Sequence, residues 1–249
     1  MKIEGRHIII TGGLIGLGRS TVARLYREKA IIAIFDIQKE NFKAMQSEFP
    51  ELSFYHCDVT DIDQVQHSVN EFYKQFGSID ILVNNAGILY NEPLLKLSPT
   101  GIQKHNIDSW NKTLLTDLTS VFYMTANVAE KMLLKRTKGL IINISSICSA
   151  GNAGQSAYSA AKAGVNALTV TWAKELGIFG IRVAAVSPGF MDTESTHSIM
   201  TETHVKEVIN EIPLRRLGKP EEVAEAIVSI IRNDYYTGSV LELSGGLNM

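Results

Sequence analysis

The chain has 249 residues, of which 45% are hydrophobic and 20% charged. A formal net charge of −2 provides no cationic field for nucleic acid or an anionic membrane, so we expect neither as a partner. The two cysteines, Cys57 and Cys148, are too few for a disulfide framework and lack metal-ligand spacing, so no metal site is expected. No apolar stretch is long enough for a signal peptide or a membrane span, which predicts a cytoplasmic protein.

Short β-branched runs alternate with longer helical patterns along the chain. The predicted strands are His7–Thr11, Ile31–Phe35, Ser53–His56, Ile81–Asn84, Leu140–Ile144, Arg182–Val186 and Ser239–Leu243. Most are nearly continuous apolar runs, which is typical of a parallel sheet covered by helices on both faces. This alternation predicts an α/β protein with a Rossmann-type, doubly wound parallel sheet. No linker or repeat interrupts it, so residues 1–249 are predicted to form one domain.

Two of the helices have clear signals in the sequence. The segment Asp61–Phe76 places its apolar residues at helical spacing. Another helix is predicted to open at Lys219-Pro220, where proline in the first turn is followed by two acids.

A glycine-rich loop, TGGLIGLG at residues 11–18, follows the first strand and leads into a helix at Arg19. Its glycines allow a tight turn and let the backbone approach a pyrophosphate, whose charge is met by helix N-terminal amides. The spacing differs from the G-x-G-x-x-G of ordinary dinucleotide folds. On its own the loop therefore fits a nucleotide site and a simple turn equally well.

An acid, Asp36, follows the second strand, eighteen residues beyond Gly18. A carboxylate here hydrogen-bonds the adenosine ribose hydroxyls and repels a 2′-phosphate, so Asp36 favours NAD over NADP. Ile37 adds no basic side chain for NADP, although Lys39 is nearby. The alternative interpretation of Asp36 is a solvated loop acid or a helix cap.

Small and polar residues follow the later strands as well. They are Asp58, residues 84–87 (NNAG), Ser145 and residues 187–189 (SPG). The carboxyl ends of parallel strands are where open α/β sheets bind ligands. Turn chemistry alone would also explain asparagine, glycine and proline at such positions.

A candidate catalytic set consists of Ser145, Tyr158 and Lys162. Tyr158 and Lys162 are four residues apart in an alanine-rich segment, so on a helix they share one face. A neighbouring ammonium favours the phenolate and brings the tyrosine into the range of proton transfer. The hydroxyl of Ser145 would orient and polarise a reacting carbonyl. An isolated Tyr-x-x-x-Lys is more often a surface pair, but here it accompanies a nucleotide loop and polar strand ends.

Together these motifs resemble the short-chain dehydrogenase/reductase family over nearly the whole chain. The motifs are TGGLIGLG at 11–18, NNAG at 84–87, Ser145, YSAAK at 158–162, SPGFMDT at 187–193, LGKPEEVA at 217–224 and the ending TGSVLELSGGLNM. The resemblance implies a seven-stranded sheet in the order 3-2-1-4-5-6-7. It also implies a homotetramer or a homodimer.

The resemblance assigns a role to each candidate residue. Tyr158 is the implied general acid/base, Ser145 the carbonyl orienter, and Lys162 the partner of Tyr158 and of the nicotinamide ribose. The implied cofactor-binding residues are Gly12, Leu14, Ile15, Gly16, Leu17, Gly18, Asp36, Asp58, Val59, Asn85, Ala86, Gly87, Tyr158, Lys162, Pro188, Gly189 and Thr193.

Two features depart from the family pattern. Asp117 stands where the family usually has an asparagine that holds a helix bulge and a proton-relaying water. An ionised Asp117 near Lys162 should raise the pKa of Tyr158 and shift the rate profile to alkaline pH. The segment Ile88–Ser109 is longer than usual and contains Pro93, Pro99 and Gly101, which predicts an irregular surface loop.

The predicted function is hydride transfer between NAD(H) and a carbonyl or secondary alcohol, with Tyr158 as the acid/base. The alternative is a catalytically impaired dinucleotide sensor or regulator of the same fold, supported by Asp117 alone. Residues 194–211 resemble the family's substrate loop, and their apolar side chains either line a pocket or pack against the core. The C-terminal half resembles 3-oxoacyl thioester reductases, which usually favour NADPH, so the substrate stays open among thioesters, small alcohols, polyols and cyclic alcohols.

Overall fold

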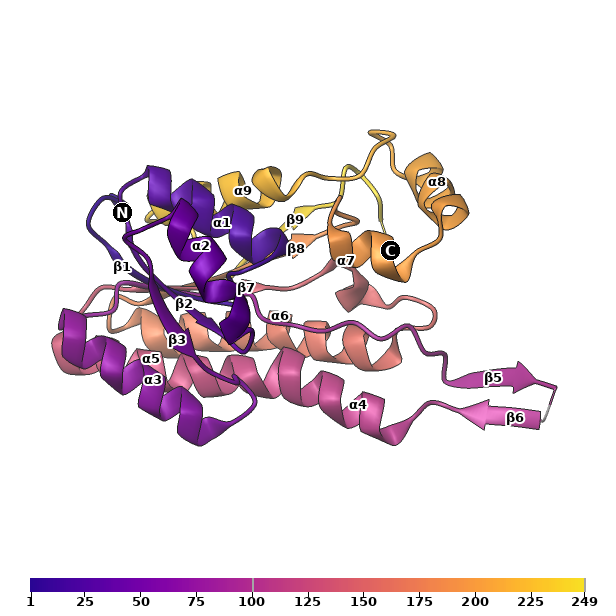
Figure 1. Ribbon diagram of the computed structural model, residues 1–249, viewed down its shortest axis with the longest axis horizontal. Coiled ribbons are helices and arrows are strands. Elements are labelled where there is room, and N and C mark those ends of the chain that lie inside the picture. The colour runs from indigo at the N-terminus through magenta and orange to yellow at the C-terminus, as the bar shows by residue number, and fades with distance from the viewer. Residues whose placement is uncertain (100, 249) are drawn as a thin grey trace.

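The computed structural model describes residues 1–99 and 101–248 and has a seven-stranded parallel sheet at its centre (Figure 1). The strand order is β3-β2-β1-β4-β7-β8-β9, which is the predicted 3-2-1-4-5-6-7 once the strands of this sheet are counted alone. The strands are β1 His7–Thr11, β2 Ile31–Asp36, β3 Ser53–His56, β4 Ile81–Asn84, β7 Leu140–Ile144, β8 Arg182–Pro188 and β9 Val240–Leu243. The Rossmann-type, doubly wound fold is therefore confirmed.

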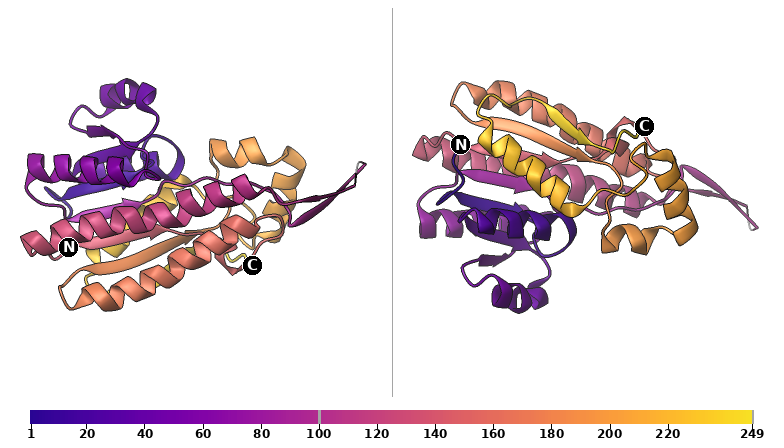
Figure 2. Two further views of the ribbon diagram at one scale, coloured as in Figure 1. Left: turned by 90° about the horizontal axis from the view of Figure 1, so that it is seen from below. Right: turned by 90° about the horizontal axis from the view of Figure 1, so that it is seen from above.

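Helices cover both faces of this sheet (Figure 2). On one face lie α1 (Gly16–Arg27), α2 (Phe42–Glu48) and α9 (Pro220–Arg232). On the other lie α3 (Ile62–Phe76), α4 (Ile107–Leu114), α5 (Ser120–Lys135) and α6 (Ser156–Gly177). Two short helices, α7 (Glu194–Ile199) and α8 (Glu202–Glu211), lie at the C-terminal end of the strands. None of the helices in the described residues is long and apolar enough to cross a membrane.

The sheet separates two hydrophobic cores, because successive strand residues point to opposite faces. In β1, Ile8 and Ile10 belong to the core under α1 and α9, whereas Ile9 between them belongs to the core under α3, α5 and α6. All three side chains are fully buried. Burial on both faces explains why the strand sequences are continuous apolar runs rather than alternating ones.

Local signals set several helix ends. The carboxylate of Asp61 accepts hydrogen bonds from the amides of Asp63 and Gln64 and so caps α3, while Gly77 ends this helix in the left-handed region at φ 75°. Helix α9 begins at Pro220, as predicted, and the Glu222 carboxylate accepts a 2.7 Å hydrogen bond from the Lys219 amide.

The expectation of an irregular loop over Ile88–Ser109 is wrong. This segment contains an antiparallel hairpin of β5 (Leu95–Ser98) and β6 (Gly101–Lys104), and its last residues belong to α4, which begins at Ile107. Pro93 lies before β5, and Pro99 and Gly101 lie where β5 ends and β6 begins, so none of the three interrupts the interior of a strand. Asn106 caps α4 by accepting the amides of Asp108 and Ser109.

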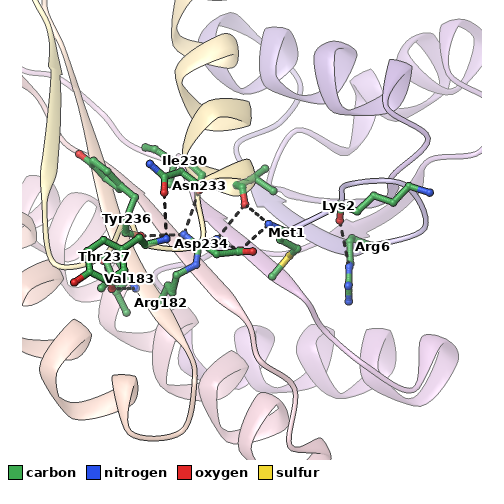
Figure 3. Close-up of polar contacts among 12 residues, drawn as sticks. Met1, Lys2, Arg6, Arg182, Val183, Ile230, Asn233, Asp234, Tyr236 and Thr237 are labelled. Atoms are coloured by element: carbon green, nitrogen blue, oxygen red, sulfur yellow. Dashed lines mark hydrogen bonds and ion pairs between the residues drawn. The ribbon is translucent and has the colours of Figure 1, made fainter.

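A cationic cluster closes the C-terminal end of α9 (Figure 3). The guanidinium of Arg182 donates to the carbonyl oxygens of Ile230 (3.1 Å), Ile231 (3.1 Å) and Tyr236 (2.9 Å). The ammonium group of Met1 donates to the Ile231 carbonyl as well, at 3.1 Å. These cations satisfy carbonyls that have no partner within the helix and lie at the negative end of its dipole.

Replacing Arg182 with glutamine is expected to lower the free energy of unfolding by about 2 kcal/mol, because several half-buried carbonyls lose a charged donor. Urea unfolding followed by tryptophan fluorescence measures this change. Arg232→Gln is the matched control at the same end of α9, since its exposed ion pair with Glu28 contributes less than about 1 kcal/mol. An equal or smaller loss for Arg182→Gln than for the control would contradict the assignment.

Candidate active site

A cavity of about 970 Å³ opens at the carboxyl ends of the strands. Most of the residues implied by the family resemblance line it. They are Gly12, Ile15, Gly16, Leu17, Asp36, Asp58, Val59, Asn85, Ala86, Gly87, Ser145, Tyr158, Lys162, Pro188, Gly189 and Thr193. These residues come from seven separate segments of the chain and meet because every parallel strand ends at the same edge of the sheet.

The glycine-rich loop forms a backbone cradle at one end of the cavity. Gly12 and Gly16 have φ angles of 64° and 53°, which only glycine adopts without strain. A Cβ atom on Gly12 would lie 2.9 Å from the Cα of Ala86, so this position has no room for a side chain. Helix α1 starts at Gly16 with neither a side-chain cap nor an acid in its first turn. Its N-terminal amides therefore suit a pyrophosphate.

The side chain of Asn85 holds this loop in place. Its amide nitrogen donates to the carbonyl oxygens of Thr11 at 3.0 Å and of Gly12 at 2.8 Å. The hydroxyl of Thr11 in turn accepts the backbone amides of Asn85 and Ala86, each at 3.0 Å. The NNAG motif therefore fixes the glycine loop to the end of β4.

Two residues of the implied cofactor set lie outside the cavity lining. Leu14 is buried in the core on the α1 side of the sheet. Gly18 lies in the first turn of α1, where a Cβ atom would be 2.6 Å from the side-chain nitrogen of Asn85. Both residues shape the loop from behind rather than from the cavity surface.

Asp36 and Asp58 lie at the nucleotide end of the cavity. One carboxylate oxygen of Asp36 accepts the Gln38 amide at 3.0 Å. Burial raises the pKa of Asp36, and hydrogen bonds from the backbone amides of Gln38, Leu14 and Ile37 partly offset this rise. Asp58 accepts the amide and the hydroxyl of Thr60 at 2.9 and 2.7 Å. Ile37, which follows Asp36 in the sequence, borders this end of the cavity and is 56% exposed. The residue next to Asp36 is therefore apolar and not cationic.

Ser145, Tyr158 and Lys162 meet at the other end of the cavity. Ser145 follows β7, while Tyr158 and Lys162 lie on successive turns of α6. The Lys162 ammonium is buried 5.5 Å from the centre of the Tyr158 ring and donates to the carbonyl oxygen of Ile144 at 3.0 Å. The Ser145 hydroxyl is 3.3 Å from the carbonyl oxygen of Lys162. The structure thus brings all three candidate catalytic residues together.

Asp117 adds a buried carboxylate to this cluster. It lies in a π-helical turn, Leu115–Thr119, between α4 and α5, so the helix bulge implied by the family resemblance is present. One oxygen accepts the Ile88 amide at 2.8 Å. The other, Oδ2, lies 3.5 Å from the Lys162 nitrogen and has no hydrogen-bond partner among the described residues. The negative charge of an ionised Asp117 would thus offset part of the positive charge of Lys162, which favours the phenolate form of Tyr158.

The pKa of Tyr158 is raised, first by burial and then by the charges of Asp117 and Cys148, while a hydrogen bond with Ser146 acts in the opposite direction. Burial also raises the pKa of Asp117, and the attraction of Lys162 counters that rise. Both effects follow from placing ionisable groups in a poorly solvated site.

Three polar residues in the cavity wall were not singled out from the sequence. The side chain of Gln155 donates to Asn91 at 2.8 Å, and that of Asn152 donates to Gln155 at 3.2 Å. Gln155 is the residue directly before α6 and lies three positions ahead of Tyr158, so it is close to the first turn that carries the tyrosine. This spacing was the available signal, whereas Asn91 and Asn152 come from loops whose positions depend on the tertiary structure.

The short helices α7 and α8 and their connections form a lid (residues 192–211) over the cavity. Ile199 and Met200 of this lid line the cavity, as does Met191 just before it. Val205 and Ile209 instead pack around the buried Val208 in a small core of their own. The predicted apolar residues are therefore divided between a pocket and internal packing of the lid. The described residues contain no group of three or more potential metal ligands.

The fold and the site define a Rossmann-type α/β protein with a dinucleotide cradle and a Ser-Tyr-Lys cluster in one cavity. A sequence model described as enoyl-(acyl carrier protein) reductase matches residues 13–248. The chain belongs to the short-chain dehydrogenase/reductase family, a family of oxidoreductases. This membership supports an enzyme that acts on carbonyl or alcohol groups and implies a nicotinamide dinucleotide cofactor.

Several known proteins are similar to this chain over almost its full length. The 3-oxoacyl-(acyl-carrier-protein) reductase of Thermotoga maritima is 37% identical to this chain, and the alignment covers 99% of each protein. The reductase of the same name from Chlamydia pneumoniae is 35% identical, and the alignment covers 99% of this chain and 98% of the relative. A solved structure from Agrobacterium tumefaciens, provisionally assigned as a gluconate dehydrogenase, superimposes with a TM-score of 0.91. It is 29% identical, with 99% of this chain and 97% of that chain covered.

Replacing Asp117 with asparagine is expected to move the pH–rate profile of alcohol oxidation toward neutral pH. The negative charge of Asp117 raises the pKa of Tyr158, so the phenolate that accepts the alcohol proton forms only at higher pH. Removing this charge lowers the pKa and therefore the pH at which the rate rises.

The measurement is kcat/KM against pH for the wild type and the variant. Asp108→Asn serves as the control, because it removes the same charge from the exposed start of α4. A profile for Asp117→Asn that coincides with that of the wild type would contradict this role.

Proposed function

We propose that the chain is an NAD(H)-dependent oxidoreductase that transfers a hydride between nicotinamide and a carbonyl or secondary alcohol carbon. The observation that carries the proposal is the single cavity that joins the glycine cradle and Asp36 at one end to Ser145, Tyr158 and Lys162 at the other. A dinucleotide bound along this cavity would place its reactive ring beside a group able to exchange a proton.

The residues of the chain have separate tasks in this reaction. NAD(H) supplies or accepts the hydride when it is bound. The hydroxyl of Ser145 donates to the substrate oxygen and orients it, and Tyr158 exchanges a proton with the same oxygen. The ammonium group of Lys162 favours the tyrosine phenolate and would contact the nicotinamide ribose. During carbonyl reduction Tyr158 gives up its proton, and during alcohol oxidation its phenolate receives one.

The preference for NAD over NADP rests on Asp36. Its buried carboxylate lies at the nucleotide end of the cavity, where it would accept ribose hydroxyls and repel a 2′-phosphate. The amides of Gly16, Leu17 and their neighbours would hold the pyrophosphate, and Asp58 and Val59 would border the adenine. Pro188, Gly189 and Thr193 would approach the carboxamide.

We further propose that residues 1–249 form one catalytic and dinucleotide-binding domain that works in the cytoplasm as a homotetramer or homodimer. Two buried, unpaired cysteines suit a reducing compartment. The substrate is a small molecule that fits the partly apolar space between Tyr158 and the lid.

The first experiment follows nicotinamide absorbance with NAD(H) and NADP(H) against a panel of alcohols and carbonyl compounds, including 3-oxoacyl thioesters and sugar acids. Turnover with NAD(H) supports the proposal and identifies the substrate class. Cofactor binding without turnover on any substrate would favour the alternative, a dinucleotide-binding sensor or regulator in which Asp117 has impaired the chemistry.

Replacing Tyr158 with phenylalanine is expected to lower kcat by roughly 10²- to 10⁴-fold, since this variant removes the proton-transfer group. Binding of the cofactor, measured by protein fluorescence, should change little, because the glycine cradle and Asp36 are untouched. A Tyr158→Phe enzyme with wild-type kcat would show that another group carries the proton.

Replacing Ile37 with arginine is expected to raise the ratio of kcat/KM for NADP over NAD at least tenfold, and Asp36→Ser should add to the change. The first variant supplies a cation for the 2′-phosphate and the second removes a repelling carboxylate. Glu40→Ser, just beyond these two positions, is the control for a general loss of negative charge. Wild-type turnover restricted to NADP(H) would overturn the assignment of Asp36.

A further inference from the structure

The hairpin of β5 and β6 forms an arm (residues 94–99 and 101–104) that projects from the body of the molecule. Both figures of the whole chain show it extending past every other element, at the end where α7 and α8 form the lid (Figures 1 and 2). The arm therefore reaches into space that its own chain does not fill.

The register of the arm gathers its apolar residues on one face. Leu97 pairs with Ile102 and Leu95 with Lys104, while Lys96 pairs with Gln103. Directly opposed residues of an antiparallel pair share a face, and successive residues alternate between faces. One face thus carries Leu95, Leu97 and Ile102 together with Lys104 at its edge, and the other carries Lys96 and Gln103.

The apolar face of the arm is open. Leu95, Leu97 and Ile102 are 59%, 84% and 68% exposed. An isolated two-stranded hairpin is marginally stable in water and needs a packing partner for its hydrophobic face. A cluster of exposed aliphatic side chains rimmed by lysines is typical of an interaction site.

The charge of the arm matches the lid of the same protein. Between positions 94 and 104 the sequence has Lys96 and Lys104 and no acid. The lid carries the exposed acids Asp192, Glu194, Glu202, Glu207 and Glu211, and Lys206 is its one lysine or arginine. Opposite charges of this kind steer two surfaces together and set their register.

A second copy of the chain can satisfy both surfaces at once. Arm and lid lie at the same end of the molecule, and the arm extends outward beyond its own lid (Figure 1). Two copies related by a two-fold axis at this end would each place an arm against the lid of the other. Such an isologous contact uses the same pair of surfaces twice.

The base of the arm is attached to the wall of the active-site cavity. The amide of Glu92 donates to the Gly154 carbonyl at 2.6 Å, and the ring of His105 is 2.9 Å from the carbonyl oxygen of Glu92. The neighbouring Asn91 accepts a hydrogen bond from Gln155, which lines the cavity. Contacts made by the arm are therefore connected to the wall beside Tyr158.

We propose that the arm of each chain docks, through Leu95, Leu97 and Ile102, on the α7–α8 lid of a second copy. The docked arm covers the mouth of the partner's cavity, because Glu194, His204 and Glu211 of the lid also line that cavity. This contact is independent of which substrate or nicotinamide cofactor the enzyme uses.

The test compares the same substitution on the two faces of the arm. Ile102→Lys places a cation in the apolar face and is expected to weaken self-association at least tenfold, seen as a lower mass in light scattering at low protein concentration. Gln103→Lys adds the same charge to the adjacent residue on the polar face and should leave the mass unchanged. Circular dichroism melting of both variants confirms that each is folded.

Cysteine trapping identifies the surfaces in contact. Both native cysteines are buried, so an introduced thiol is the reactive one. A mixture of Leu97→Cys and Glu207→Cys chains is expected to form a covalent dimer on mild oxidation, in higher yield than a mixture of Gln103→Cys and Glu207→Cys chains. A monomeric wild type, equal masses for Ile102→Lys and Gln103→Lys, or equal trapping from both faces would overturn the proposal.

Discussion

The buried ammonium group of Lys162 is the constraint on which the site depends. It is held by the Ile144 carbonyl at the end of β7 and faces Asp117 in the π-helical turn between α4 and α5. A buried cation needs such partners, because an unpaired charge in this position would be strongly destabilising. The same contacts fix the turn of α6 that carries Tyr158, so the fold and the catalytic cluster are positioned by one set of interactions.

Asp117 changes the electrostatic balance of that cluster. Burial raises the pKa of Tyr158, and the negative field of the Asp117 carboxylate raises it further, so both oppose formation of the phenolate. Burial raises the pKa of Asp117 itself, and the positive charge of Lys162 counters that rise. The pair therefore links the position of the lysine to the proton chemistry of the tyrosine.

The two ends of the cavity use different physical means of recognition. The nucleotide end depends on backbone: glycines with positive φ, a helix N-terminus and a loop held by Asn85. The substrate end depends on side chains from loops, including the Asn91–Gln155 contact at the base of the arm. Backbone geometry follows from the fold, whereas loop side chains vary independently of it, which leaves room for a specificity particular to this chain.

The sequence by itself determined the strands, their order through the family resemblance, and the three candidate catalytic residues, because apolar periodicity and short motifs are local properties. Only the tertiary structure decided which residues meet. It placed Leu14 and Gly18 behind the loop, brought Asn91 and Asn152 into contact with Gln155, and turned a segment marked by Pro99 and Gly101 into a hairpin. Contacts between distant segments depend on how the chain packs around the sheet, and no local pattern encodes that arrangement.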